Sequence, residues 1–280
     1  MIVNQTKQIL NKYSTFAKKA YGQNFLIKEH VIDEIVKNSG IDKNTFVIEI
    51  GPGIGALTEA LAINAKKVLC YEIDTQMVEI LKDTLSNYDN VMIKNIDFLK
   101  VDIDKDIDEI FEKGYEVKVV ANLPYYITTP IIFKLLESKK ITELMFMVQK
   151  EVGARLTGKP QTKDYNALSV LMKYKTESRI VSNVSRKCFF PEPNVDSVLL
   201  HIKVVKTDYG LTNEPKFLEF IRKLFDQRRK TIVNNLHSFY KFDKAEIEQK
   251  MIELGFDINL RAEALDISQI VSLYIAIFES

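Results

Sequence analysis

Short apolar runs separated by segments of helical spacing recur through the first half of this sequence, and they constrain the fold more than any other feature. Residues 45–50, 67–71, 91–94, 117–121 and 144–149 are short and mostly apolar, as buried strands are. Segments predicted as helices lie between most of these runs. Strands joined through helices form a parallel, doubly wound sheet, so we expect an α/β fold.

The pattern changes after residue 207. Residues 178–183 and 197–204 are predicted to be strands that close the sheet as a pair. Four later segments have helical spacing, and they cover 214–225, 229–239, 244–254 and 268–278. We therefore expect an α/β domain over residues 1–206, which opens with a basic helical lead-in, and a small all-helical domain over residues 207–280.

Composition excludes several classes of protein. The 280 residues are 46% hydrophobic, yet no apolar run is long enough to span a membrane, and the first residues do not resemble a secretory signal. The two cysteines and three histidines are scattered and match no metal or redox motif. We expect a cytoplasmic protein without a bound metal. We also expect a monomer, because the sequence singles out no apolar surface for a second copy.

Charge is unevenly distributed in a chain whose net charge is only +1. Residues 97–116 contain eight acidic and three basic side chains. Residues 150–187 contain nine basic and three acidic side chains, and residues 216–230 contain six basic and two acidic ones. A surface polarised in this way attracts phosphates to its basic side, with an affinity that falls as salt is added. The distribution favours a nucleic acid as a partner, although the total charge does not.

Glycines and an acid follow the first two predicted strands. Gly51 and Gly53 lie in the turn after residues 45–50, where glycine lets the backbone turn tightly and approach a ligand. Glu72 ends the next strand, and an acid there suits the two hydroxyls of a ribose. The same glycines, with Ala56, also fit a dinucleotide fingerprint, so a nicotinamide-dependent oxidoreductase is an alternative.

Two further strand ends carry polar residues that hydride transfer does not explain. Asp97 is placed to accept a hydrogen bond from an adenine amine, with Ile73 or Phe98 packed against the ring, and Asn122 ends the strand at residues 117–121. No proton relay typical of an oxidoreductase stands out. S-adenosylmethionine suits the predicted site better, because its sulfonium already activates the methyl group and the protein needs only to orient it.

The tetrad Asn122-Leu123-Pro124-Tyr125 points to methyl transfer onto an exocyclic amine. The amine of adenine is a poor nucleophile, since its lone pair is delocalised into the ring. Hydrogen bonds from its two hydrogens to the Asn122 side-chain oxygen and the Leu123 carbonyl would favour the tetrahedral nitrogen of the transition state. Pro124 stiffens the loop, and the Tyr125 ring offers a surface on which an extracted base can stack, a contact worth about 1–3 kcal/mol.

Taken in order, six segments resemble those of the KsgA-type ribosomal RNA adenine dimethyltransferases. They are the basic stretch 18–26 ending in Gly-Gln-Asn-Phe-Leu, residues 49–55, Glu72, Asp97 with the tetrad 122–125, the Phe-x-Pro-x-Pro-x-Val-Asp-Ser motif at 189–197, and Arg-Arg-Lys-Thr at 228–231. The resemblance implies a Rossmann-like class I methyltransferase sheet with a small helical C-terminal domain. It implies transfer of two methyl groups to N6 of each of two adjacent adenines in the 3′-terminal hairpin loop of small-subunit (16S) ribosomal RNA, and a role in 30S subunit biogenesis.

The resemblance also implies roles for individual residues. Contacts to S-adenosylmethionine or its immediate surroundings would come from Asn24, Leu26, Gly51, Gly53, Glu72, Ile73, Asp97, Phe98 and Asn122. Phe189 would stack on the target base opposite Tyr125. Contacts to the RNA backbone would come from Lys18, Lys19, Arg228, Arg229 and Lys230.

Two alternatives share these features. The related family that dimethylates one adenine of large-subunit RNA and confers macrolide resistance has similar cofactor motifs, but residues 127–130, the Phe189 motif and residues 228–231 favour the small-subunit enzyme. A non-catalytic RNA-binding assembly factor would keep the fold and would have no need of hydrogen-bond acceptors at Asn122 and Leu123.

Overall fold

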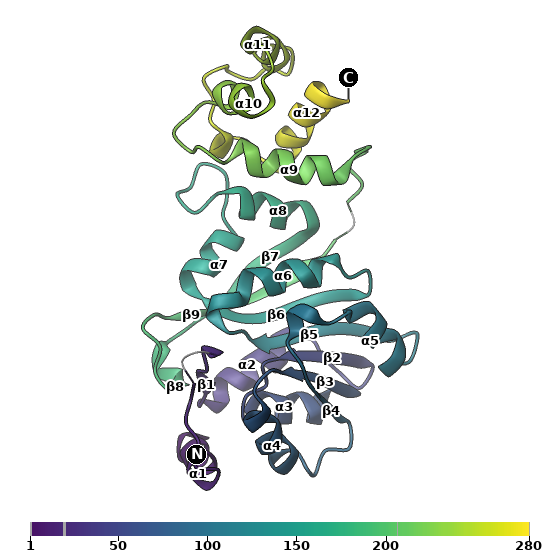
Figure 1. Ribbon diagram of the computed structural model, residues 1–280, viewed down its shortest axis with the longest axis vertical. Coiled ribbons are helices and arrows are strands. Elements are labelled where there is room, and N and C mark those ends of the chain that lie inside the picture. The colour runs from purple at the N-terminus through teal and green to yellow at the C-terminus, as the bar shows by residue number, and fades with distance from the viewer. Residues whose placement is uncertain (1, 19–20, 206, 280) are drawn as a thin grey trace. The chain divides into compact units, whose positions relative to one another are not determined.

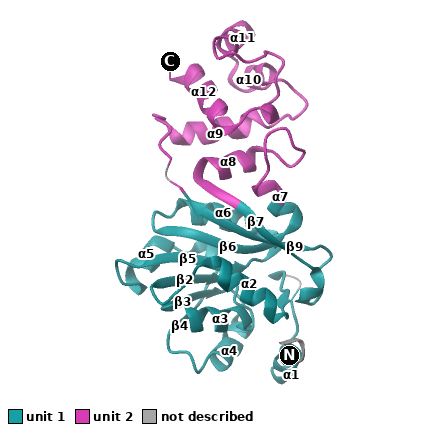
Figure 2. Cartoon of the chain, turned by 180° about the vertical axis from the view of Figure 1, so that it is seen from behind, with its two compact units in different colours: residues 1–153, 179–204 teal, residues 154–178, 205–280 magenta. Residues whose placement is uncertain are grey.

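The computed structural model describes residues 2–18, 21–205 and 207–279 (Figure 1). Its internal contacts divide the chain into two compact units (Figure 2). Unit 1 comprises residues 1–153 and 179–204, and unit 2 comprises residues 154–178 and 205–280. The contacts therefore group residues 154–178 with the C-terminal helices. The division into domains at residues 206 and 207 remains a prediction about which parts of the chain fold independently.

A seven-stranded sheet forms the centre of unit 1, in the order β4-β3-β2-β5-β6-β9-β7. Its strands are β2 (Thr45–Ile50), β3 (Lys67–Glu72), β4 (Val91–Asn95), β5 (Glu116–Asn122), β6 (Ile141–Gln149), β7 (Thr176–Val184) and β9 (Ser197–Val204). The five strands from β4 to β6 are parallel, and β9 runs antiparallel to β6. The predicted parallel sheet, closed by the pair of later strands, is confirmed.

Both faces of the central strands are buried. The helices between the strands are α2 (Glu29–Ser39), α3 (Ala56–Asn64), α4 (Thr75–Thr84), α5 (Ile103–Ile110) and α6 (Thr128–Glu137). Alternate strand residues such as Val47 and Val120 pack in one cluster with side chains of α2 and α3. Their neighbours Ile48 and Val119 point to the opposite face, because side chains alternate along a strand, and they are fully buried too. This two-sided burial explains why the strands read as continuous apolar runs.

A two-residue ribbon joins segments that are far apart in the sequence. Strand β1 (Phe25–Leu26) pairs antiparallel with β8 (Phe189–Phe190), so that Leu26 lies opposite Phe189. Helix α1 (Ile2–Lys12) precedes this ribbon. Strands this short carry no periodicity, and the sequence did not predict them.

Unit 2 is helical and has an aromatic core. It contains α8 (Ala167–Lys175), α9 (Glu214–Leu224), α10 (Ile232–Tyr240), α11 (Lys244–Glu253) and α12 (Ile267–Phe278), while α7 (Lys150–Leu156) crosses from unit 1 into it. Phe217 and Tyr274 are fully buried and their rings meet edge to face, with centroids 5.1 Å apart. Helix α10 begins at Ile232, three residues later than predicted, because the Thr231 side chain accepts a hydrogen bond from Asn234 N and caps the helix there.

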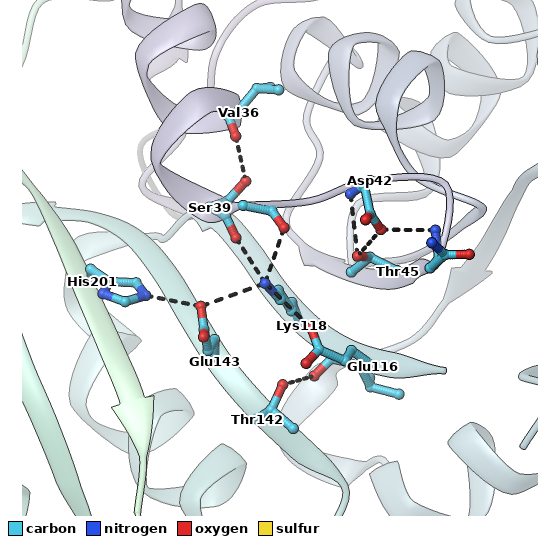
Figure 3. Close-up of polar contacts among 12 residues, drawn as sticks. Val36, Ser39, Asp42, Thr45, Glu116, Lys118, Thr142, Glu143 and His201 are labelled. Carbon is cyan, nitrogen blue, oxygen red and sulfur yellow. Dashed lines mark hydrogen bonds and ion pairs between the residues drawn. The ribbon is translucent and has the colours of Figure 1, made fainter. Parts of the chain in front are cut away.

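A buried lysine ties α2 to the amino-terminal part of β5 (Figure 3). Lys118 Nζ donates to the carbonyls of Ser39 and Gly40 at 3.3 and 3.1 Å, where α2 ends. It also forms ion pairs with Glu116 at 3.5 Å and with Glu143 at 3.6 Å.

No helix in the described ranges is long and apolar enough to cross a membrane.

Candidate active site

A pocket of about 200 Å³ opens at the carboxyl ends of strands β2, β3, β4 and β5. Its walls include nine of the predicted cofactor residues, namely Asn24, Leu26, Gly51, Gly53, Glu72, Ile73, Asp97, Phe98 and Asn122. The remaining tetrad residues, Leu123, Pro124 and Tyr125, line it as well. The structure therefore brings together the strand-end residues that the sequence singled out. Their roles toward a ligand remain predictions.

The glycine turn after β2 adopts a conformation that favours glycine. Gly51, Gly53 and Gly55 have φ values of 69°, 61° and 92°, in the left-handed region that other residues rarely adopt. A Cβ on Gly53 would lie only 3.0 Å from the Phe25 ring. The turn and the β1 ribbon therefore pack so closely that a side chain at this position would require the Phe25 ring to shift.

Glu72 is held in a fixed orientation at the end of β3. The side chain is 5% exposed. Its Oε1 accepts a hydrogen bond from Asp74 N at 2.9 Å, and its Oε2 accepts one from Gly53 N at 3.2 Å. Burial raises the pKa of this carboxyl above its usual value, while the backbone hydrogen bonds oppose the shift. The remaining lone pairs face a pocket in which they can accept hydrogen bonds from hydroxyls.

A second buried carboxyl, that of Glu49, belongs to the same pocket. It is 1% exposed, and the Cys70 thiol donates to its Oε2 at 3.8 Å. Burial raises the pKa of Glu49 to about 8. The sequence placed Glu49 in the glycine motif without giving it a separate role. A carboxyl at this position can lose its proton when a cation binds nearby.

Asp97 and Phe98 form the wall beyond β4. Asp97 Oδ1 accepts a hydrogen bond from Leu99 N at 3.0 Å, which caps a short 3₁₀ turn and orients the carboxylate. Phe98 is 4% exposed and packs against the Tyr71 ring, with the two centroids 5.3 Å apart. Ile73 is 44% exposed and is the more accessible apolar surface for a flat ring.

The tetrad is braced by residues from distant parts of unit 1. Asn122 Nδ2 donates to the Asn24 carbonyl at 2.9 Å, so the side-chain oxygen Oδ1 remains to accept a hydrogen bond from a ligand. Leu123 N donates to the carbonyl of Met147 on β6 at 3.3 Å. The Tyr125 hydroxyl and Ser197 Oγ on β9 share a hydrogen bond of 2.7 Å. Burial raises the pKa of Tyr125, so its hydroxyl is neutral.

Phe189 is not brought to the pocket. It is 2% exposed and lies in the core cluster of the sheet, opposite Leu26 in the β1 ribbon. That Phe189 stacks on the target base opposite Tyr125 remains a prediction. Two other aromatic residues, Tyr21 and Tyr126, do line the pocket, and Tyr126 is 57% exposed. No sequence motif singled out either residue for the pocket, although Tyr126 directly follows the tetrad.

The predicted RNA-binding residues have different surroundings. Lys18 Nζ pairs with Asp74 at 2.9 Å, and Lys19 lies outside the described residues. Arg228 Nε pairs with Glu263, and its Nη2 donates to the Lys163 carbonyl at 3.2 Å. Arg229 and Lys230 are exposed and form no salt bridge with another described residue.

The charges of the pocket favour a cationic adenosyl compound over a dinucleotide. Three carboxyls, those of Glu49, Glu72 and Asp97, line it, and none of its described lining residues is Lys, Arg or His. A pyrophosphate would find no cation here and would meet these acids. The lining therefore fits S-adenosylmethionine, which has a positive sulfonium and no phosphate. No group of His, Cys, Asp and Glu suited to a metal ion occurs among the described residues.

The sequence is similar to those of known proteins over nearly its whole length. The family model described as ribosomal RNA adenine dimethylase matches residues 15–278. Among curated proteins, those named ribosomal RNA small subunit methyltransferase A are similar. The one from Oceanobacillus iheyensis is 47% identical over 270 residues, 95% of this chain and 92% of its own length. The one from Bacillus mycoides is 48% identical over 276 residues, 96% of this chain and 94% of its own.

Two solved structures share the fold along most of the chain. A dimethyladenosine transferase from Plasmodium falciparum has a TM-score of 0.76 and 27% identity, with 91% of this chain and 98% of that chain covered. The 23S rRNA methyltransferase ErmE has a TM-score of 0.69 and 25% identity, with 90% of this chain and 99% of that chain covered. The predicted class I methyltransferase fold is thereby confirmed.

Proposed function

The chain belongs to the ribosomal RNA adenine dimethylase family, and from this premise we propose how its pocket works. The protein is an S-adenosylmethionine-dependent ribosomal RNA adenine dimethyltransferase. It dimethylates adenines of small-subunit ribosomal RNA. We propose that the targets are N6 of two adjacent adenines in the 3′-terminal hairpin loop. We further propose that it acts as a cytoplasmic monomer on a 30S particle during subunit biogenesis.

The orientation of Asn122 is the observation that carries the mechanism. Its Nδ2 is engaged by the Asn24 carbonyl, which leaves Oδ1 as the acceptor for the target amine. Leu123 lines the same pocket, and its backbone carbonyl would be the second acceptor. Two acceptors fixed before the substrate arrives can stabilise charge that develops on the amine, without reorganising during the reaction.

We assign the cofactor to the part of the pocket formed by the ends of β2, β3 and β4. Glu72 would accept hydrogen bonds from the ribose, Asp97 from the adenine amine, and Ile73 would pack against the ring. When bound, S-adenosylmethionine supplies a methyl group activated by a positive sulfonium. The residues of the chain then need to hold the amine in line with it and to exclude water.

Tyr125 is placed to receive the base. Its ring is fixed by the hydrogen bond between its hydroxyl and Ser197, and Pro124 limits the motion of the loop before it. An adenine drawn out of its loop loses stacking energy of a few kcal/mol. Stacking on an aromatic ring restores about 1–3 kcal/mol of this. A second ring, from Phe189 as predicted or from the exposed Tyr126, would add to it.

The alternatives are less favoured. Curated relatives with small-subunit names are 47% and 48% identical, whereas the large-subunit enzyme ErmE is 25% identical. A non-catalytic factor has no use for an Asn122 side chain that is fixed by donating a hydrogen bond to the Asn24 carbonyl in a distant segment. A nicotinamide-dependent oxidoreductase is disfavoured because the chain belongs to the ribosomal RNA adenine dimethylase family.

Transfer of a labelled methyl group from S-adenosylmethionine tests the proposal. We expect label in small-subunit particles that lack the modification, recovered as dimethyladenosine, and none in large-subunit RNA. The Asn122→Ala variant should lose at least about 100-fold in kcat and should bind RNA as well as the wild type. Asn87→Ala, an exposed asparagine beyond α4, is the matched control and should keep full activity. Label in large-subunit RNA, or equal loss of RNA binding and transfer in Asn122→Ala, would contradict the proposal.

A further inference from the structure

The segment before β1 is held against helix α4 by two acidic residues. We call residues 12–18 and 21–24 the lead segment. At one end of α4, Asp83 accepts hydrogen bonds from Lys12 Nζ at 2.5 Å and from the Tyr13 hydroxyl at 2.6 Å, and these three side chains lie on the surface. At the other end, Asp74 accepts from Lys18 and Gln23. Only the second anchor is buried, since the Asp74 side chain is 3% exposed.

Asp74 makes more contacts than a helix cap requires. Its Oδ1 caps α4 by accepting from Gln76 N at 3.1 Å, which a serine or threonine would do as well. The same oxygen accepts from Lys18 Nζ at 2.9 Å, and Oδ2 accepts from Gln23 Nε2 at 3.0 Å. Gln23 Oε1 in turn accepts from Lys18 N at 2.8 Å. The carboxylate therefore closes a ring of hydrogen bonds around the lead segment.

This ring is continuous with both halves of the active site. On one side, the backbone N of Asp74 donates to Glu72 Oε1 at 2.9 Å. On the other side, Gln23 is followed directly by Asn24, whose carbonyl accepts from Asn122 Nδ2 at 2.9 Å. Buried hydrogen bonds to an ionised group are stronger than neutral ones, so this connection is stiff.

We infer that Asp74 is a positioning residue, which holds the lead segment in place. The segment in this position closes one side of the cofactor pocket, and its Asn24 carbonyl orients the Asn122 amide. The inference rests on the proposed function, because it assumes that Asn122 accepts from the target amine. Asp74 itself does not line the pocket, and it acts through Gln23 and Asn24. We call the contacts of Asp74 with Lys18 and Gln23 the brace. The Lys18 ammonium then pairs with Asp74 rather than with an RNA phosphate.

Asp74→Asn is the variant that separates the brace from the cap. An asparagine still caps α4, because its side-chain oxygen can accept from Gln76 N. It loses the charge that pairs with Lys18, and its amide nitrogen faces the donor Gln23 Nε2. We expect about tenfold weaker binding of S-adenosylmethionine by calorimetry without RNA, and kcat at saturating cofactor lower by about tenfold. The melting temperature should stay within a few degrees of that of the wild type.

Asp83→Asn is the matched control, since it changes the other carboxylate that anchors the lead segment to α4. Asp83 is exposed and its partners lie far along the segment from Asn24. We expect cofactor affinity and kcat within about twofold of the wild type. Equal losses in Asp74→Asn and Asp83→Asn would mean that any loosening of the segment has this effect, and would overturn a specific role for Asp74.

A reciprocal change should restore function. Combining Asp74→Asn with Gln23→Glu reverses donor and acceptor, because the new amide at position 74 can donate to the new carboxylate at position 23. That carboxylate can still accept from Lys18 N and can pair with the Lys18 ammonium. We expect the double variant to recover most of the lost affinity and kcat, and Gln23→Glu alone to be impaired. Additive losses in the double variant would overturn the inference.

Lys18→Met tests the assignment of the lysine. If Lys18 braces Asp74, the variant should weaken cofactor binding as Asp74→Asn does and leave the salt dependence of RNA binding unchanged. A fall of about one in the slope of log K against log salt would instead assign Lys18 to a phosphate. Wild-type protein that neither binds S-adenosylmethionine nor transfers methyl groups would defeat the proposed function. Full cofactor affinity and kcat in Asp74→Asn would defeat this inference alone.

Discussion

Glu49 shows how burial sets the state of a single side chain in the pocket. Its carboxyl is almost inaccessible and has a pKa raised to about 8 by burial, against about 4.3 for an exposed glutamate. At neutral pH it is therefore protonated in the cofactor-free protein. Because this pKa is higher in the folded than in the unfolded protein, the protonated carboxyl favours folding. The contribution to stability is complete below the pKa of the unfolded state, and it is lost as the pH rises through the pKa of the folded state.

Glu49→Gln should therefore flatten the pH dependence of stability in the absence of cofactor. Between pH 5 and 8 the wild type should lose up to about 1.4 kcal/mol per pH unit through this group, whereas the neutral glutamine loses none. Thermal unfolding at several pH values measures the difference. Glu79→Gln, an exposed glutamate on α4, should follow the wild-type curve. Parallel curves for Glu49→Gln and the wild type would contradict the prediction.

Residues in and around the pocket differ in whether a local sequence pattern could predict them. Gly51, Glu72, Asp97 and Asn122 were predictable, because the carboxyl ends of parallel strands meet at one edge of the sheet. Asp74 was not, since its role depends on Lys18 and Gln23, which reach it from more than fifty residues earlier. No local pattern distinguishes it from an ordinary helix cap.

Among the elements, strand β5 carries a pocket residue at one end and a structural residue near the other. Asn122 lies in the pocket, while Lys118 holds the last carbonyls of α2 and pairs with Glu143. Burial raises the pKa of Glu143, but the hydrogen bond with His201 and the charge of Lys118 outweigh this, so the pKa lies below its usual value. The stability from this carboxylate is thus present above about pH 4.3 and is lost on further acidification.

Lys118→Met should loosen this junction. Methionine fills a similar volume but leaves the carbonyls of Ser39 and Gly40 without their donor and Glu143 without a cation. Removing one partner of a buried pair costs about 3–5 kcal/mol, and we expect about 2 kcal/mol here because Glu143 is partly exposed. Urea unfolding measures it. Lys105→Met, which breaks an exposed pair on α5, should change stability by less than about 0.5 kcal/mol, and a similarly small effect of Lys118→Met would contradict the prediction.

The elements differ in how well the sequence predicted them. Strand β2 and helix α9 have bounds within one residue of the prediction, because each combines a clear apolar pattern with an end signal. The β1 ribbon and helices α5, α7 and α8 were not predicted. A two-residue strand is defined by its partner, and a short helix is stabilised by packing more than by its own spacing.

At the scale of the whole molecule, charge distribution governs the encounter with RNA. Arg229 and Lys230 are exposed in unit 2 and form no salt bridge with another described residue, so both are available to phosphates. Replacing both by alanine should weaken RNA binding and reduce the slope of log K against log salt by about 1.5 to 2. Filter binding over a range of salt concentrations measures the slope.

The matched control replaces Lys100 and Lys113, two exposed lysines of the acidic stretch 97–116, by alanine. The charge change is the same, so a non-specific effect of net charge would appear in both double variants. We expect the control to keep the wild-type slope. Equal slopes for Arg229 and Lys230 variants and the wild type would mean that this basic cluster faces solvent in the complex.

The acidic lining of the pocket has a consequence for the shape of the bound RNA. A nucleotide is a neutral base joined to an anionic backbone, and a cavity that holds the carboxyls of Glu72 and Asp97, with no cation among its described lining residues, favours the neutral part. We therefore expect the pocket to admit a neutral base more readily than a phosphate. The proposed role of Asn122 then requires the sugar-phosphate chain to stay at the rim, with the target base rotated outward from that chain into the pocket.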